Sequence, residues 1–274
     1  MTLRQWKAML SRSSLAVATA VSLAACGTRE PSTDAERLAR GRELVQQMSA
    51  KLAAATDVNA TTTELRDVVS SSGAKTSVSL TGEYALRRPD RFYIKSTGRR
   101  GIEAWYNGKT VTLASHQDKV FAQAPMPETT DRMLDALAER YNLPLPLGDL
   151  FYSSPEKALL SDKTTGGYAG TETVDGTSCH HLKFKDVGVS WELWLPVKGD
   201  GLPKRFKVVQ EKRKGAPATD VTFTAWNLAA ATDLAKFTPN VPKDYEGIAI
   251  LQRAAAVKNA ALAGAPDPGA PAKK

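Results

Sequence analysis

The sequence predicts a mainly β protein with a few helices (α+β), built as one half-open antiparallel β-barrel with covering helices. Two long runs of residues alternate between apolar and polar side chains, as strands with one buried face do. Short turn signals, and no helices, separate the segments within each run, which excludes a parallel β-α-β arrangement. About ten strands in one chain of this size favour a single curved sheet over two domains.

The composition is that of an ordinary soluble globular protein. The chain has 274 residues, of which 42% are hydrophobic and 24% charged, with 19 Gly and 15 Pro. A chain of this length buries enough surface to fold without disulfide bonds or a structural metal. Its two cysteines, Cys26 and Cys179, exclude a disulfide-rich scaffold and a four-cysteine zinc site.

Residues 1–25 have the composition of an export signal. Arg4, Lys7 and Arg12 precede an uncharged apolar run over residues 13–25. A helix needs about 20 residues to cross a bilayer, so this run is too short for a permanent transmembrane anchor.

Leu23-Ala24-Ala25-Cys26 resembles a bacterial lipobox, so Cys26 is expected to be lipidated and to become the first residue. Gly27 and Thr28 lack the aspartate that retains such lipoproteins at the inner membrane. We therefore expect a lipid anchor in the outer membrane, facing the periplasm. The alternative is an ordinary signal peptide that has a cysteine near its end.

The basic charge does not indicate a nucleic-acid partner. The formal net charge of +8 falls to +5 once residues 1–25 are removed, because they carry three cations and no acid. The remaining Lys and Arg residues form no stripe along the sequence. No nucleic acid is expected among the partners.

A polar tether over residues 26–33 leads into an amphipathic helix. Thr33 is the expected N-cap, and apolar residues recur at helical spacing to about residue 55. The first run of strands follows. Its clearest members are residues 75–86, 91–96, 102–106 and 110–114, with Asn107-Gly108 as a tight hairpin turn.

A helical insert separates the two runs of strands. Residues 129–141 place Met133, Leu134, Leu137 and Tyr141 on one helical face, and short helical pieces are expected at 147–152 and 155–161. The second run then has five expected strands. They are residues 168–174, 179–185, 190–195, 205–212 and 220–226.

The end of the chain is expected to be extended over residues 237–245. The barrel domain is expected to span residues 34–253, and residues 254–274 form an Ala/Pro-rich tail predicted to be disordered.

Several separate stretches carry a family resemblance. They are Arg88-Pro89-Asp90, Tyr106-Asn107-Gly108-Lys109, Leu143 to Leu147 with Asp149-Leu150, Gly176 with Cys179-His180-His181-Leu182, Trp191 with Trp194, and Leu202-Pro203-Lys204. Together they resemble an uncharacterised family of predicted periplasmic proteins, related to the LolA/LolB-like lipoprotein-carrier superfamily. The resemblance covers roughly residues 40–248 and implies a half-open barrel with an apolar cavity under a helical lid.

The only reactive-looking cluster is Cys179-His180-His181. Strand alternation places Cys179 and His181 on one face and His180 on the other, so the two histidines cannot chelate one ion. No base or oxyanion motif accompanies the thiol. The sequence therefore predicts no catalytic residues, no metal site and no cofactor.

Aromatic and apolar side chains are the better candidates for ligand contacts. A curved sheet points one face of each strand inward, and a wide half-barrel needs helices to close it. The alternative is that these side chains only fill the core. The predicted ligand-binding residues are Trp105, Phe121, Leu134, Leu137, Tyr141, Trp191 and Trp194.

These observations predict a non-catalytic, lipid-anchored protein. Its inner groove is expected to accept a hydrophobic acyl ligand, from a lipid or from another lipoprotein, in transport or sensing. The alternative is a structural or interaction lipoprotein whose core is packed shut and whose surface binds another envelope protein. A hollow interior would favour the acyl-binding function, and a filled interior would favour the structural or interaction function.

Overall fold

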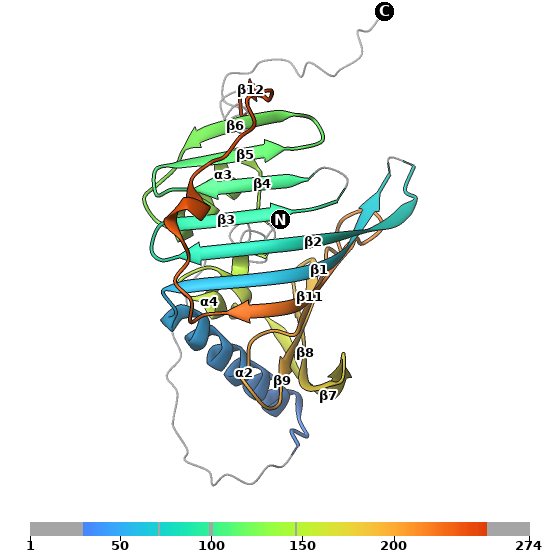
Figure 1. Ribbon diagram of the computed structural model, residues 1–274. Helices are drawn as coiled ribbons and strands as arrows, with labels where there is room; N and C mark the ends of the chain where they lie inside the picture. Colours follow the sequence, from blue (N-terminus) through green and yellow to red (C-terminus); the bar gives the residue numbers. More distant parts are fainter. Residues whose placement is uncertain (1–29, 71, 99–100, 146, 251–274) are drawn as a thin grey trace, which may run out of the picture.

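The computed structural model describes residues 30–250 except 71, 99–100 and 146, and they form one curled sheet (Figure 1). The strand order is β12-β6-β5-β4-β3-β2-β1-β11-β10-β9-β8-β7. Every pairing is antiparallel except β12 with β6, and β12 does not pair with β7. The predicted fold class, an unclosed and curled antiparallel sheet with a few helices, is confirmed.

The strands and helices are arranged in two blocks around a helical insert. In chain order they are α2 (Asp34–Ala54), β1 (Asp57–Val69), β2 (Lys75–Arg87), β3 (Arg91–Ser96), β4 (Ile102–Tyr106), β5 (Thr110–Ser115), β6 (Val120–Pro125), α3 (Thr130–Tyr141), η1 (Gly148–Leu150), α4 (Pro155–Leu159), β7 (Thr165–Val174), β8 (Thr177–Asp186), β9 (Val189–Pro196), β10 (Arg205–Val209), β11 (Ala218–Asn227), η2 (Leu234–Phe237) and β12 (Glu246–Ile248).

Helix α2 begins at the predicted N-cap, Thr33, and the structure adds a complete capping box with Glu36. The Thr33 hydroxyl accepts from the Glu36 backbone N–H at 3.2 Å, and the Glu36 carboxylate accepts from the N–H groups of Ser32 and Thr33. These backbone donors lower the pKa of Glu36 to about 2. The start of α2 is therefore fixed locally.

Two glycines let α2 lie directly on β7. A Cβ added to Gly41 would lie 2.8 Å from the Cα of Gly167, and Gly167 has a φ of +141°. No side chain fits between the helix and the strand at this crossing. Leu44, Val45 and Met48 from α2 are then buried in the core of the sheet.

The hairpin between β4 and β5 is confirmed. Gly108 has a φ of +89°, and the Asn107 side-chain oxygen accepts from the backbone N–H groups of Lys109 and Thr110 at 3.1 and 2.9 Å. The turn chemistry fixes the register that pairs Tyr106 with Val111.

The described residues form twelve strands, against about ten predicted. β1, β6 and the three-residue β12 are not among the nine ranges named from the sequence, and β10 ends at Val209 because a reverse turn begins at Gln210. The segment over 237–245 is not uniformly extended, since Phe237 ends the 3₁₀ helix η2.

The segment Leu234–Ile248, here called the C-terminal strap, crosses the outer face of the sheet, while α3 and α4 lie on the other side (Figure 1). Phe237 is buried against Ala85, Tyr93 and Trp105. The strap is also tied by polar contacts, from Lys236 to Glu83 and from Lys119 to Asp244.

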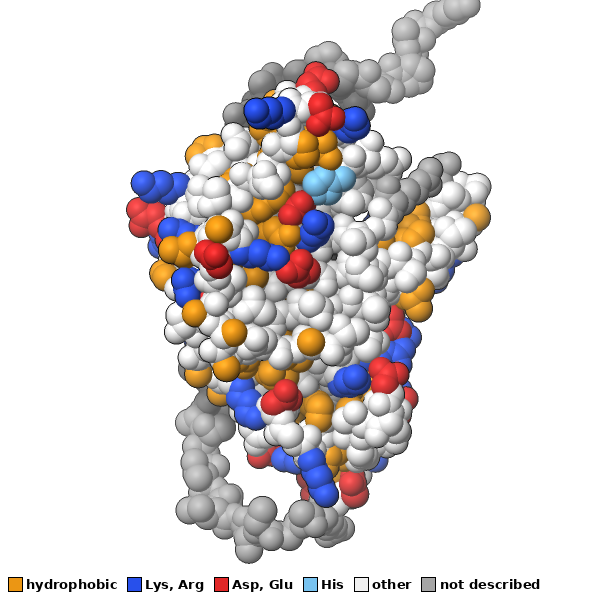
Figure 2. All heavy atoms as spheres, in the orientation of Figure 1, with side chains coloured by type: hydrophobic (Ala, Val, Ile, Leu, Met, Phe, Trp, Pro, Cys, Tyr) orange, Lys and Arg blue, Asp and Glu red, His pale blue; other side chains and the backbone are white. Residues whose placement is uncertain are grey.

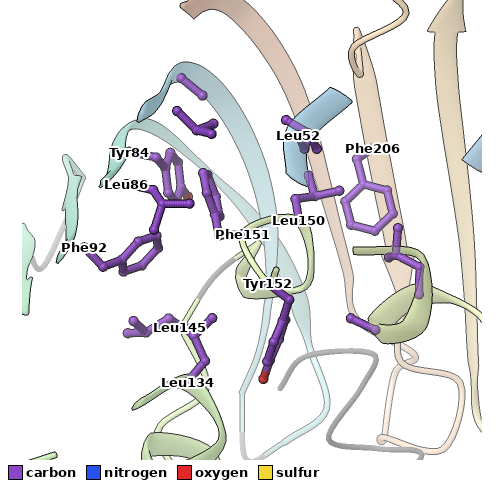
Figure 3. Close-up of a cluster of buried hydrophobic side chains, with 14 of the residues drawn as sticks. Leu52, Tyr84, Leu86, Phe92, Leu134, Leu145, Leu150, Phe151, Tyr152 and Phe206 are labelled. Carbon is purple, nitrogen blue, oxygen red and sulfur yellow. The ribbon is translucent and has the colours of Figure 1, made fainter. Parts of the chain in front are cut away.

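The inner face carries the main core (Figure 3). Phe151, just after η1, stacks on Tyr84 from β2 at a centroid distance of 5.5 Å and meets the edge of Phe92 from β3 at 5.2 Å. Leu134 and Leu137 from α3 are fully buried in the same cluster. The helical insert thus fills most of the concavity. Among the described residues, no helix is long and apolar enough to cross a membrane.

Candidate functional site

A pocket of about 250 Å³ remains on the inner face, between the strands β1, β10 and β11 and the loop that joins α3 to η1. Its lining combines apolar side chains with two arginines and three carboxylates. The residues are Glu64, Arg66, Asp67, Pro144, Leu145, Leu147, Asp149, Phe206, Val208, Gln210, Arg213, Pro217, Ala218 and Thr219.

The apolar wall of this inner pocket comes from two sides. Phe206 and Val208 project from β10, and Leu145 and Leu147 project from the loop opposite. Leu147 has a φ of +54°, a conformation that is costly for a branched side chain, so the loop is held in an unusual shape beside the pocket. Apolar walls of this kind suit a hydrocarbon chain.

A buried carboxylate, Glu64, lies at the side of the pocket. Its Oε1 accepts from the Tyr84 hydroxyl at 2.7 Å and from the Thr62 hydroxyl at 3.1 Å, and its Oε2 accepts from Arg66 Nη2 at 2.9 Å. A Cβ on Gly82 would lie 2.8 Å from Oε1. The absent side chain at Gly82 therefore makes room for the carboxylate.

The electrostatics of this cluster follow from burial and charge. Burial raises the pKa of Tyr84 well above its ordinary value, and the neighbouring Glu64 carboxylate raises it further. Tyr84 therefore remains a neutral hydrogen-bond donor. Arg66, about one third exposed, balances the charge of Glu64 and presents its guanidinium to the pocket.

Asp67 ties the strands together at the pocket mouth. It accepts from the Ala218 backbone N–H at 3.0 Å and from the Ser77 hydroxyl at 2.7 Å, and it lies 3.3 Å from Lys75. These donors lower the pKa of Asp67. Arg213 completes the mouth and donates to the Gln210 side chain at 2.9 Å.

The structure distributes the predicted ligand-binding residues among three clusters. Leu134, Leu137, Tyr141 and Trp191 belong to the main inner cluster, next to the pocket wall formed by Phe206. The rings of Trp191 and Phe206 meet edge to face at 6.0 Å. Ligand contact by these side chains stays a prediction.

The other three predicted residues lie away from the inner face. Trp105 and Phe121 pack under the C-terminal strap, and Trp194 packs against Val174 and Cys179. The seven residues therefore do not line one common space. The reason is strand alternation, since Trp191 and Trp194, three residues apart, point to opposite faces.

The Cys179-His180-His181 segment alternates as predicted. His181 lies on the outer side with Nδ1 2.9 Å from Glu172 and Nε2 2.8 Å from Glu192, and its ring stacks on Trp194. Because the two carboxylates take opposite ring nitrogens, they do not converge on one ion. Within residues 30–250 as described, no group of three or more metal-ligating side chains could hold a metal.

The two cysteines differ in what the structure describes. Cys26, the predicted lipidation site, lies outside the described residues, as does the predicted tail over 254–274. Cys179 is buried, and that burial raises the pKa of its thiol. A buried thiol with a raised pKa is poorly suited to nucleophilic chemistry.

Sequence reasoning missed the polar part of the site. Glu64, Arg66 and Arg213 were not singled out, because the alternation of β1 normally places apolar residues at buried positions. The signal that could have indicated the polar part of the site is the pair Thr62 and Glu64, two polar residues at positions of an alternating strand that face inward.

The structure is a curled, unclosed sheet with a pocket on its inner face, and comparison with known families identifies the family. The chain belongs to the DUF2092 family of predicted periplasmic proteins, whose model matches residues 41–251. The predicted family is confirmed. Comparison with curated proteins gives no match.

Solved structures with a similar chain path have low sequence identity. An uncharacterised conserved protein from Thermus thermophilus is 14% identical with a TM-score of 0.45, covering 76% of this chain and 98% of that one. A LolA superfamily protein from Nitrosomonas europaea is 9% identical with a TM-score of 0.32, covering 73% and 98%. A chain of the Pseudomonas aeruginosa MucA/MucB complex is 14% identical with a TM-score of 0.39, and the match covers 73% of this chain and 61% of that one.

Proposed function

We propose that this protein is a non-catalytic, outer-membrane lipoprotein that faces the periplasm and binds an acyl chain, from a lipid or a lipoprotein, on the inner face of its sheet. The observation that carries the proposal is the inner pocket, where apolar walls meet an arginine-bearing mouth. The family supports a periplasmic setting. The lipobox residues ending at Cys26 support the anchor.

The driving force would be burial of hydrocarbon. At about 25 cal/mol per Å², an acyl chain that buries about 300 Å² gains about 7 kcal/mol before ordering costs. The pocket volume of about 250 Å³ is below the usual range for ligand pockets, about 300–1,000 Å³. A long chain therefore requires the loop carrying Leu145 and Leu147 to move away from β10.

The mouth of the pocket supports an acyl ligand with a polar end. Arg66 and Arg213 lie beside the apolar wall formed by Phe206 and Val208. A polar group of the ligand would stay at the arginines, while the chain enters between the sheet and the helical insert. Transport and sensing both require such reversible entry.

A second candidate function is a structural or interaction lipoprotein with a closed interior. The dense packing of Leu134, Leu137 and Phe151 into the concavity favours it. In that case the protein would act through an outer surface that binds another envelope protein.

Native mass spectrometry distinguishes the two functions. We would purify the mature chain over residues 26–274 with Cys26→Ser from bacterial periplasm without detergent, and identify any bound molecule after extraction. An acyl-containing adduct that is lost in Val208→Asp, a change at a half-buried side chain of the pocket wall, supports the binding function. If the measured mass is that of the protein alone and the protein takes up no fluorescent fatty acid, the structural or interaction function with a closed interior is supported.

A further inference from the structure

A second groove lies at the other end of the sheet from the inner pocket. It runs between α2 and the ends of β8 and β9, and it has a volume of about 270 Å³. The inner pocket adjoins the end of β10 near Val208, whereas this groove adjoins Pro196 at the opposite end of the neighbouring β9. We call it the α2 groove. Its lining is Arg40, Leu44, Gln47, Met48, Lys51, His180, Leu195, Pro196, Val197, Gly199 and Gly201.

The α2 groove has an apolar floor and a cationic lining. Leu44 and Met48 from α2 face Leu195 and Pro196 from β9. The polar side chains of the described lining are Arg40, Gln47, Lys51 and His180, and none of them is a carboxylate. Such a surface complements a molecule that is apolar along its length and negatively charged at one end.

Arg40 and His180 form one end of the groove. The Nδ1 atom of His180 is buried and has no hydrogen-bond partner, which is rare for a buried polar atom. Arg40 gives one of its five N–H groups to Glu43 at 2.7 Å. Burial lowers the pKa of His180, and the positive charge of Arg40 lowers it further, so His180 is neutral near pH 7 and contributes a hydrogen-bonding nitrogen while Arg40 contributes the charge.

Lys51 lies at the other end and has a different role. It is eleven residues after Arg40 on the same helix, about 16 Å along the axis, so one small anion cannot reach both. Its ammonium group donates to the Asp200 carbonyl and ties the loop over 197–201 to α2. The unpartnered nitrogen is at the other end, near Arg40.

We propose that the α2 groove is a separate binding site for a single-chain anionic amphiphile. The carboxylate or phosphate group is held between Arg40 and His180. The alkyl chain lies along Leu44 and Met48 toward Val197, whose side chain is 41% exposed. Glu43 pairs with Arg40 at 2.7 Å and the charge of Glu30 acts on His180, so a bound anion competes with Glu43 for Arg40.

The experiment compares decanoate with decanol, which has the same chain and no charge. Titration of isotope-labelled full-length mature protein with decanoate, below its micelle concentration, is expected to shift the ring signals of His180. Decanol is expected to leave them unchanged. Arg40→Gln is expected to weaken this decanoate response about tenfold, the loss of one charged hydrogen bond.

Matched variants make the assignment falsifiable. Arg37→Gln removes the same charge from an exposed position of α2 outside the groove, and it should leave decanoate affinity unchanged. An equal loss in Arg37→Gln and Arg40→Gln, or no response of His180, would overturn the proposal. A loss in Lys51→Gln as large as in Arg40→Gln would overturn the placement of the anion.

The test is independent of the inner pocket. Val208→Asp changes a half-buried side chain that lines the inner pocket and not the α2 groove, so it should abolish binding of decanol and leave the His180 response to decanoate. If Val208→Asp removes the His180 response as well while the protein stays folded by circular dichroism, the α2 groove is not a separate site. If decanol never binds while His180 still responds, only the function proposed for the inner pocket fails.

Discussion

The Tyr84 hydroxyl donates a 2.7 Å hydrogen bond to the Glu64 carboxylate, and both side chains are fully buried on the inner face of the sheet. The two residues lie on the adjacent strands β1 and β2, and Gly82 leaves the space in which they meet. Burying a carboxylate is costly unless hydrogen-bond donors or cations pair with it. The pair therefore links the stability of the sheet to the side of the pocket.

Removing the hydroxyl tests this link. Tyr84→Phe should lower the free energy of unfolding by about 1–3 kcal/mol, because the buried carboxylate of Glu64 loses a donor. Urea denaturation followed by circular dichroism measures the change. Tyr106→Phe is the control, since its hydroxyl donates to the neutral Pro127 carbonyl, and about 1 kcal/mol is expected there. Equal losses would contradict a special role for Glu64.

Acid should weaken the pocket mouth through Asp67. The folded-state pKa of Asp67 is lowered, so its contribution to stability is complete above the ordinary carboxyl pKa and is lost as the pH falls through the lowered value. Asp67→Asn should therefore be less stable than the wild type near neutral pH. The difference should shrink below about pH 4 in urea titrations. Asp162→Asn, at an exposed turn, serves as the control, and a pH-independent difference would refute the assignment.

Leu134→Ala should both destabilise the core and enlarge the space beside Leu145 (Figure 3). A loss of about 2–5 kcal/mol is expected for a fully buried leucine. If the inner face holds an acyl chain, affinity for decanol should rise, because the new cavity adjoins the pocket loop. Leu159→Ala on α4 removes an equally buried side chain and should lower stability without raising affinity.

Replacement of Cys26 tests the anchor. Cys26→Ser removes the thiol that lipidation requires, so the protein should move from the membrane fraction to the soluble periplasmic fraction. Cell fractionation and immunoblotting measure this, and the same protein with Cys179→Ser is the control. Continued membrane fractionation of Cys26→Ser would reject the lipid anchor.

Local chemistry made most of the fold predictable. The capping box of Thr33 and Glu36 and the Asn107-Gly108 turn act within four residues, so the sequence alone indicates where these elements begin and turn. Apolar alternation then places neighbouring strands in an antiparallel sheet.

Long-range contacts explain what was not predicted. His116 joins Glu103 at 2.8 Å and Tyr245 at 2.8 Å, although Tyr245 is 129 residues away. No local pattern marks such a contact. The pocket mouth is similar, because Arg66 and Arg213 meet only after β1 and β11 pair.

Charged side chains of both signs share the outer face of the sheet. In Figure 2, acidic and basic side chains are interspersed over this face, with apolar patches between them and no continuous basic area. Binding to a polyanion requires clustered positive charge.

The C-terminal strap has a consequence for self-association. Strand β6 would otherwise be a bare edge, able to pair with an edge strand of another molecule. The strap turns over that edge, and Glu246–Ile248 pairs in parallel with Val120, Phe121 and Ala122. An incoming strand must first displace this pairing and extract Phe237 from its cluster. The strap thus protects this edge of the sheet from pairing with a strand of another molecule.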